Sequence, residues 1–238
     1  MIAEKILWVV NYNDLSNFVN KALAVRASGV AIRTDCNLDI AIPEFHKHGI
    51  NVYGWRWPSA KKDAAMQEAY KAAKLLSNGM DGYFVDPEGA KGKPWDWDLS
   101  GLDSLADEFC DTIKSSAKNK PFGITSHYLA KKAYPRLPWA SFFKYADVFL
   151  PQAYWRTEKG VIGHGIPDDN FRVSKSFWAN AGAPLEKIFP MAGELGFTKA
   201  SEISLYSQEA HRQQKPITNF YAYNENVSPA VWDAVSKA

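Results

Sequence analysis

Two carboxylates lie two residues apart in Asp86-Pro87-Glu88, directly after the apolar run Gly82-Tyr83-Phe84-Val85. A carboxyl group that follows a buried strand is poorly solvated, and two carboxyl groups held close together resist ionising at the same time. One of them then keeps its proton to a higher pH and can act as a general acid. The pattern predicts acid–base chemistry at Asp86 and Glu88. The plainer alternative is that Asp86 caps the following loop and Glu88 is a solvated surface acid.

Such a pair needs a fold that places both carboxyl groups at one accessible edge of the protein. Short β-rich runs alternate with segments of helical periodicity along the whole chain. After the first run the sequence reads Asn11-Tyr12-Asn13-Asp14, without the glycines of an open dinucleotide-binding sheet. We therefore expect a single (β/α)8 barrel domain over residues 1–238. Its eight strands are expected at residues 6–10, 30–33, 51–55, 82–86, 121–125, 148–152, 188–191 and 217–223.

Barrel enzymes carry their chemistry at the C-terminal ends of the strands. Here these ends combine carboxylates, amides, hydroxyls and indoles, the set that binds carbohydrate, because indole faces stack on sugar C–H surfaces and polar groups bond the ring hydroxyls. Trp95 and Trp97 are further candidates for the cleft wall, whereas Trp8 and Trp178 are expected in the core. A polysaccharide is the expected partner, and the candidate substrate-binding residues are Asn11, Arg33, Trp57, His127, Gln152, Tyr154, Trp155 and Tyr221.

The segment Phe84-Val85-Asp86-Pro87-Glu88-Gly89 resembles the strand-four signature of the family 25 lysozymes and, more loosely, of the family 18 chitinases. Residues 148–155, Val-Phe-Leu-Pro-Gln-Ala-Tyr-Trp, resemble their sixth strand, where a Tyr faces the sugar. The resemblance implies cleavage of β-1,4 links beside an N-acetylated sugar, with peptidoglycan as the expected substrate. One position departs from the lysozyme pattern, because Asn11 stands where that family has an Asp.

In the mechanism that this resemblance implies, Glu88 protonates the leaving oxygen while Asp86 assists the substrate's own acetamido group, which attacks the anomeric carbon. Tyr154 would donate to the acetamido oxygen, and Gln152 would bond a neighbouring hydroxyl.

Two alternatives remain. Glu194 follows the seventh strand and could pair with Glu88 as nucleophile and acid, as in another clan of barrel glycosidases. The barrel could also bind carbohydrate without catalysis, since Asn11 is consistent with a lost acid.

The rest of the sequence bears on other function classes. The formal net charge of +2 is spread along the chain, so nucleic acid is not an expected partner. No apolar stretch approaches the length of a membrane helix, and no signal peptide is evident, so we expect synthesis in the cytoplasm, from which the protein could be released to act on the cell wall. Cys36 and Cys110 are expected as buried thiols. The histidine spacing predicts no metal site, and the loops after strands seven and eight lack a phosphate cradle, so no cofactor is expected.

Overall fold

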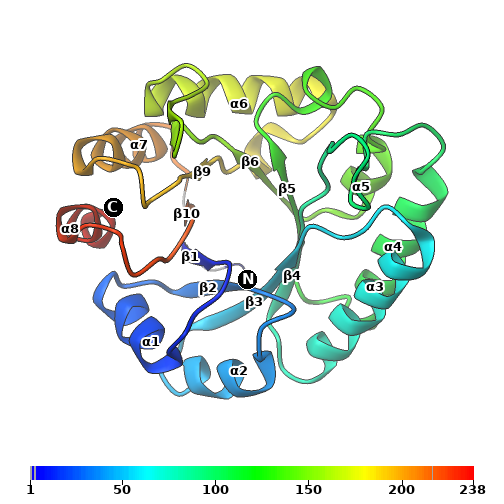
Figure 1. The fold of residues 1–238 in the computed structure, drawn as a ribbon, viewed down its shortest axis with the longest axis horizontal. Coiled ribbons are helices and arrows are strands. Elements are labelled where there is room, and N and C mark those ends of the chain that lie inside the picture. The colour runs from blue at the N-terminus through cyan, green and yellow to red at the C-terminus, as the bar shows by residue number, and fades with distance from the viewer. Residues whose placement is uncertain (1, 3, 216) are drawn as a thin grey trace.

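The computed structural model describes residues 2, 4–215 and 217–238. In these residues, eight parallel strands follow the order β6-β5-β4-β3-β2-β1-β10-β9, and a ring of helices surrounds them (Figure 1). β6 approaches the segment before β9 at an isolated parallel bridge between Phe149 and Ile188, where the Phe189 N–H donates to the Phe149 carbonyl at 2.8 Å. The sheet therefore forms the (β/α)8 barrel that the sequence predicts.

The elements recur in strict alternation around the barrel. The parallel strands are β1 (Lys5–Val9), β2 (Gly29–Arg33), β3 (Asn51–Arg56), β4 (Gly82–Val85), β5 (Phe122–His127), β6 (Val148–Gln152), β9 (Met191–Ala192) and β10 (Thr218–Phe220). The helices are α1 (Leu15–Ala24), α2 (Leu38–His46), α3 (Lys62–Ser77), α4 (Asp103–Ser116), α5 (Trp139–Tyr145), α6 (Pro167–Ala181), α7 (Ala200–Arg212) and α8 (Pro229–Lys237). None of the helices in the described ranges has the length and apolar composition needed to cross a bilayer.

Successive side chains of each strand enter two different cores, because side chains alternate across a sheet. One set fills the inside of the barrel, where the Trp8 ring lies 5.2 Å from the Phe84 ring and 5.7 Å from the Trp55 ring, between centroids. The Trp8 indole N–H donates to Asn219 Oδ1 at 2.9 Å, which satisfies its one polar atom. The other set, such as Val85, packs outward against the helices. The barrel interior is thus a packed core and leaves the mouth as the place for a site.

The sequence predicts the central residues of the barrel strands, whereas several observed strand ends differ from the predicted ones. The predicted strand at 188–191 is only Met191–Ala192, because Pro190 lacks the N–H that a ladder requires. The predicted strand at 217–223 ends at Phe220. A short hairpin of β7 (Arg156–Thr157) and β8 (Gly160–Val161) was not predicted, since two-residue strands give no periodic signal.

Phe84 tests whether the barrel interior stabilises the fold. Its ring is fully buried between those of Trp8 and Tyr53, so Phe84→Ala should lower the free energy of unfolding by about 3–5 kcal/mol through lost burial and a residual cavity. The matched control is Tyr70→Ala, because the Tyr70 side chain on α3 is 62% exposed and its loss should change the stability by no more than about 0.5 kcal/mol. Urea unfolding of both variants measures the difference. Equal effects would contradict the description of the core.

Candidate active site at the barrel mouth

The alternation that fills the barrel continues past the strand ends and points particular side chains into the mouth. Phe84 belongs to the interior core, so Asp86, two residues later, continues on the same face. Leu150 likewise precedes Gln152 on β6. The two side chains meet, since Gln152 Nε2 donates to Asp86 Oδ1 at 2.9 Å. Two strands separated by β5 therefore deliver an amide and a carboxyl to one point.

The Asp86 carboxyl is buried, with 6% of the residue exposed. Its backbone N–H donates to the Arg56 carbonyl at 2.8 Å, which ties the end of β4 to β3. Burial raises the pKa of Asp86 well above its ordinary value, and the nearby Glu88 carboxylate raises it further, while the hydrogen bond from Gln152 opposes both effects. Asp86 therefore tends to hold a proton that an exposed aspartate would lose.

Glu88 lies in a segment that is fixed on both sides. Its carbonyl accepts from the Trp97 N–H at 2.8 Å, and the preceding Pro87 carbonyl accepts from Ser126 Oγ at 2.6 Å. Asp96 holds the loop between them, because its Oδ1 accepts from the backbone N–H groups of Ala90 and Asp98 at 3.1 Å each. Burial raises the pKa of Glu88 as well, against the effect of Gln152. The two carboxyl groups therefore form a desolvated, electrostatically coupled pair on a rigid segment.

Two tyrosines lie beside the loop that carries Glu194. The rings of Tyr154 and Tyr221 stack at 5.3 Å with an interplanar angle of 16°. Burial raises the pKa of both hydroxyls, and negative charge on Asp86, Glu88 and Glu194 raises each further. Glu194 lies near both rings, because the adjacent Gly193 packs against Tyr154 and Glu194 lines a cavity together with Tyr221.

Glu194 is half-buried in the loop after β9. Its N–H donates to the Arg156 carbonyl at 3.1 Å, so the loop is anchored to the β7 strand. Burial raises the pKa of the Glu194 carboxyl, and Glu158 adds to this effect. The adjacent Gly193 has no side chain because a Cβ there would lie 2.7 Å from the Tyr154 ring. Glu194 is therefore held more firmly than its glycine-rich surroundings suggest.

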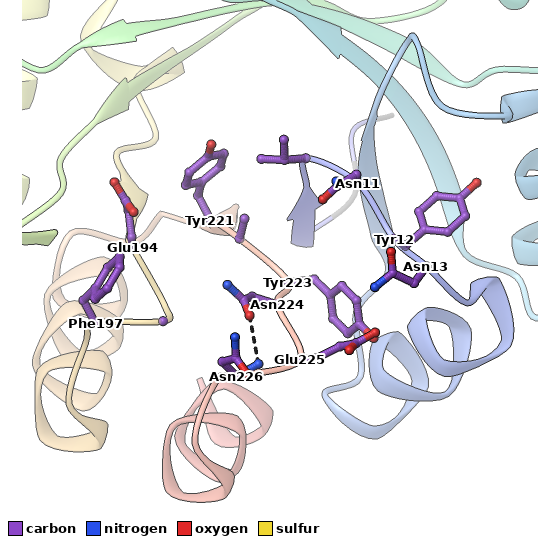
Figure 2. A pocket seen from close by; sticks show the side chains of 13 residues that line it. Asn11, Tyr12, Asn13, Glu194, Phe197, Tyr221, Tyr223, Asn224, Glu225 and Asn226 are labelled. Carbon is purple, nitrogen blue, oxygen red and sulfur yellow. Dashed lines mark hydrogen bonds between the residues drawn. The ribbon is translucent and has the colours of Figure 1, made fainter. Parts of the chain in front are cut away.

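A cavity of about 340 Å³ opens beside Glu194 and Tyr221. Figure 2 shows that the loops after β1, β9 and β10 supply its walls, with Glu194 and Tyr221 pointing the same way. Asn11 lines the cavity, which agrees with its predicted place at the rim. The labelled lining residues combine amides, carboxylates and aromatic rings: Asn11, Tyr12, Asn13, Glu194, Phe197, Tyr221, Tyr223, Asn224, Glu225 and Asn226.

The predicted rim residues Arg33 and Trp57 lie together at the ends of β2 and β3. The Arg33 guanidinium carbon is 5.1 Å from the Trp57 ring centroid, and that of Arg56 is 5.4 Å away. Asp35 pairs with both guanidinium groups and neutralises part of their charge. The positive charge of Arg33 opposes the rise in the pKa of Tyr221 that burial and the neighbouring carboxylates cause.

His127 ends β5 next to this site and is partly buried. Its ring stacks against that of Tyr128 at 4.8 Å, and its Nδ1 accepts from the Leu129 N–H at 3.1 Å. Desolvation lowers the pKa of the imidazole, which favours the neutral ring. This surrounding gives His127 a packing role, and contact with substrate stays a prediction.

Two tryptophans expected in the cleft wall lie in the core instead, so both expectations are wrong. Trp155 and Trp97 have no exposed surface, and no ring face is free to stack on a sugar. The side chain of Trp155 points away from the barrel interior and into the core under the helices, where its indole N–H donates to Glu202 Oε2 at 3.2 Å. Trp97 donates to the Pro58 carbonyl at 3.0 Å. Trp8 and Trp178 are buried, as the sequence predicts.

Tyr134 is a site residue that the sequence does not reveal. It lies in the loop between β5 and α5, and a Cβ on Gly89 would stand 2.5 Å from its ring. Burial raises the pKa of its hydroxyl to about 12, with further effects from Glu88 and Asp86. No motif marks this position, because its packing against Gly89, next to Glu88, arises only from the path of the loop.

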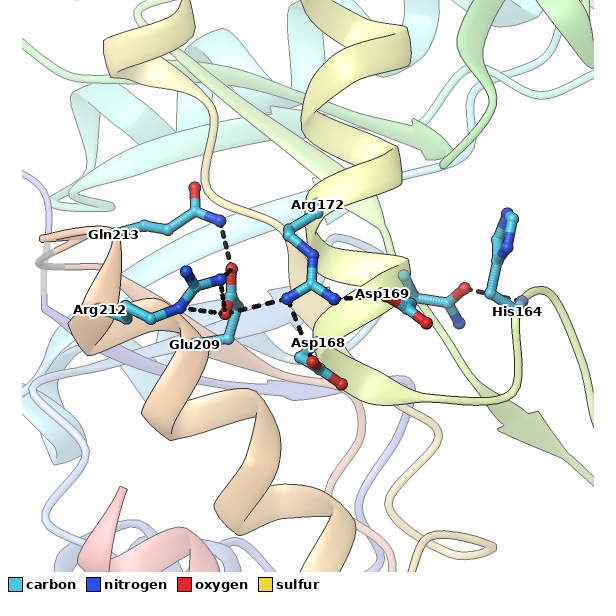
Figure 3. A network of polar contacts seen from close by, with 8 residues as sticks. His164, Asp168, Asp169, Arg172, Glu209, Arg212 and Gln213 are labelled. Carbon is cyan, nitrogen blue, oxygen red and sulfur yellow. Dashed lines mark hydrogen bonds and ion pairs between the residues drawn. The ribbon is translucent and has the colours of Figure 1, made fainter.

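A second cluster of charges lies away from the mouth and joins α6 to α7 (Figure 3). The buried carboxylate of Glu209 accepts from Arg172 at 3.4 Å, and from Arg212 and Gln213 on its own helix. Asp168 also pairs with Arg172. The charges of this network satisfy one another, which indicates a structural role. Within the described residues, no group of three or more His, Cys, Asp or Glu side chains is arranged to hold a metal ion.

Comparison with known proteins gives no match to a protein-family model and none to a curated protein sequence. Solved structures share the fold. The glycoside hydrolase domain of PgaB (BpsB) from Bordetella bronchiseptica is 11% identical with a TM-score of 0.64, over 99% of this chain and 98% of that one.

A class V chitinase from Pseudomonas fluorescens Pf-5 is 9% identical with a TM-score of 0.67, over 98% of both chains. A putative deoxyribose-phosphate aldolase from Toxoplasma gondii ME49 is 9% identical with a TM-score of 0.61, over 98% of this chain and 93% of that one. At such identities the likeness shows the (β/α)8 fold, which glycosidases and aldolases share.

Burial of the Asp86 carboxyl should make the free energy of unfolding depend on pH. Its pKa is raised in the folded state, so the folded protein binds this proton more tightly than the unfolded chain, and stability is lost as pH rises through the folded pKa. Asp86→Asn removes the titrating group and should lose less stability than the parent between pH 5 and pH 8. Urea unfolding at both pH values measures this. The exposed Asp233, changed to Asn, serves as the control, and equal pH dependence of parent and Asp86→Asn would refute the assigned shift.

Proposed function

We propose that this protein is a glycoside hydrolase that cleaves β-1,4 links of an N-acetylated polysaccharide, with peptidoglycan as the substrate. The observation that carries the proposal is the coupled, desolvated carboxyl pair of Asp86 and Glu88 at the open end of the barrel. A pair of this kind retains a proton to a higher pH than exposed carboxyl groups do, and this proton can be given to a leaving oxygen. The chitinase and PgaB domains are consistent with the proposal because they combine the same fold with activity on glycosidic bonds.

In the proposed reaction the Glu88 carboxyl gives its proton to the glycosidic oxygen as the bond from that oxygen to the anomeric carbon breaks. The carbonyl oxygen of the substrate's acetamido group forms a bond to the anomeric carbon. The carboxyl pair shares one proton, and with this proton on Glu88 the Asp86 carboxylate stabilises the positive charge that develops on the acetamido group. Water then attacks the anomeric carbon, which breaks the bond to the acetamido oxygen, and Glu88 takes up a proton from this water. No enzyme nucleophile is required.

The neighbouring side chains have positioning roles in this reaction. The Tyr154 hydroxyl would donate to the acetamido oxygen, and its stacking on Tyr221 limits the movement of its ring. Gln152 fixes the Asp86 carboxyl by the 2.9 Å hydrogen bond and would bond a sugar hydroxyl through its remaining polar atoms. Arg33, Trp57 and Asn11 lie on the rim where further sugar units would pass.

A second mechanism uses Glu88 as the acid and Glu194 as the nucleophile. The observation that favours it is that Glu194 lines a cavity together with Tyr221, whose ring stacks on Tyr154, and that negative charge on Glu194, Asp86 and Glu88 raises the pKa of both hydroxyls. A retaining enzyme of this type needs its carboxyl groups about 5–5.5 Å apart, and an inverting one about 6.5–9.5 Å apart. The first mechanism accounts better for the burial of Asp86, which the second leaves without a role.

Glu88→Gln tests both mechanisms, because Glu88 supplies the acid in each. The change keeps the shape and removes the proton, so hydrolysis should fall by about 10²-fold or more while folding is retained. Clearing of a peptidoglycan suspension and release of reducing ends from chitin measure the rate. Glu108→Gln, an exposed acid on α4, is the matched control. Full activity of Glu88→Gln would refute both mechanisms, and binding to either polymer without hydrolysis by the parent would favour a non-catalytic barrel.

Asp86→Asn and Glu194→Gln separate the two mechanisms. Substrate assistance predicts a loss of about 10²-fold or more for Asp86→Asn and a smaller loss for Glu194→Gln, because only Asp86 faces the acetamido group. The two-carboxylate mechanism predicts the reverse order. Rates are measured on one soluble chitin oligosaccharide, with the unfolding midpoint of each variant recorded to exclude loss of structure.

A further inference from the structure

A second cavity of about 370 Å³ lies on the helical side of the mouth, between β3 and α3. Arg56 belongs to the outward alternation of β3, so its side chain leaves the barrel towards α3. Trp57 lies at the boundary, because its ring packs on Trp55 inside the barrel at 5.2 Å and also lines the cavity. The cavity is thus separate from the carboxyl pair, and Trp57 forms its border with the barrel interior. Its lining residues are Arg56, Trp57, Pro58, Ser59, Ala64, Gln67, Glu68, Lys71 and Trp95.

Hydrogen bonds fix the walls of this cavity. The Pro94 carbonyl accepts from Ser59 Oγ at 3.0 Å and from the Ala60 N–H at 2.7 Å. The Trp97 indole N–H donates to the Pro58 carbonyl at 3.0 Å. These bonds join the loop after β3 to the loop that carries Trp95. The two indoles Trp57 and Trp95 therefore belong to a preformed wall, and such a wall costs little ordering when a ligand binds.

The charges in the cavity favour an anion. Lys71 makes no ion pair within the described part of the chain. Arg56 pairs with Asp35 through one nitrogen at 2.7 Å, and its other N–H groups remain as donors. Glu68 is the one acid among the lining residues, and it is partly satisfied internally, since Thr34 Oγ1 and the Tyr83 hydroxyl donate to its Oε1 at 2.6 and 3.2 Å. Burial raises the pKa of Glu68, while Arg56 and Lys71 oppose this.

We propose that this cavity binds a sugar residue that carries a carboxylate, such as a uronic acid. The Lys71 ammonium and the free guanidinium donors of Arg56 pair with the carboxylate, because charge-assisted hydrogen bonds to a carboxylate are the strongest contacts that these groups can make. The faces of Trp57 and Trp95 contact the C–H surface of the ring, and Gln67 and Ser59 bond its hydroxyls. The binding requires neither hydrolysis nor the carboxyl pair, so it can be tested apart from the proposed function.

The test is calorimetric titration of the protein with trigalacturonate, and with maltotriose as a neutral sugar of the same length that lacks the acetamido groups of the proposed substrate. Trigalacturonate should bind the parent and Glu88→Gln equally, and more tightly at low than at high salt. Lys71→Gln should weaken its binding by about tenfold, whereas Lys74→Gln, one turn further along α3, should not. Trp95→Ala should also weaken it.

Three results would overturn the proposal: no binding of trigalacturonate by a folded parent, tighter binding of the neutral trisaccharide, or equal effects of Lys71→Gln and Lys74→Gln. Circular dichroism of each variant checks that the fold is kept. Because both lysines lie on the exposed face of α3, their replacement leaves the core intact. Failure here with full activity on peptidoglycan or chitin would leave the proposed function standing.

Discussion

The hydrogen bond from Gln152 to Asp86, 2.9 Å long, joins two strand ends across the mouth of the barrel, and the candidate site depends on it. It requires the alternation of side chains along β4 and β6, which places both groups on the interior face. It also requires the turn after β4, which Ser126 holds through the Pro87 carbonyl. Because Gln152 is uncharged, it replaces part of the lost hydration of Asp86 without neutralising it. The pKa of the carboxyl therefore stays raised.

Two regions of different character lie on either side of this bond. The cavity beside Glu194 and Tyr221 offers amides, aromatic rings and two carboxylates. The cavity between β3 and α3 offers two indoles, a guanidinium and an ammonium group. A polymer that lies over the mouth would meet the carboxyl pair between them. Such an arrangement binds sugar units away from the reacting bond, and this binding energy can help to orient the bond over Glu88.

Much of this arrangement can be predicted from the sequence, because it follows from periodicity. The apolar run that ends at Val85 predicts both β4 and the place of Asp86 and Glu88 at its end, and the same holds for Gln152 after Leu150. The helix α3 is equally predictable, since Ala65, Ala69 and Ala72 share one buried face.

The features that the sequence did not predict come from the path of loops. Trp155 stands one residue beyond Tyr154, and this single step turns its ring from the mouth to the helical core. Tyr134 packs against Gly89, next to Glu88, from a loop with no motif of its own. Trp57 and Trp95 are both expected in a cleft wall, but the sequence does not reveal that they line a separate cavity, where Pro94 is bonded to Ser59 and Ala60. Contacts of this kind are set by tertiary structure, and no local pattern encodes them.

The central claim is that the substrate's acetamido group acts as the nucleophile beside Asp86. The most direct measurement compares hydrolysis rates of 4-nitrophenyl β-chitobioside and its analogues that carry a fluoroacetamido or trifluoroacetamido group at the scissile sugar. Fluorine withdraws electrons from the carbonyl oxygen, so the account predicts that the rate falls steeply with each added fluorine. Equal rates across the series would contradict it, because an enzyme nucleophile such as Glu194 does not depend on the acetamido oxygen.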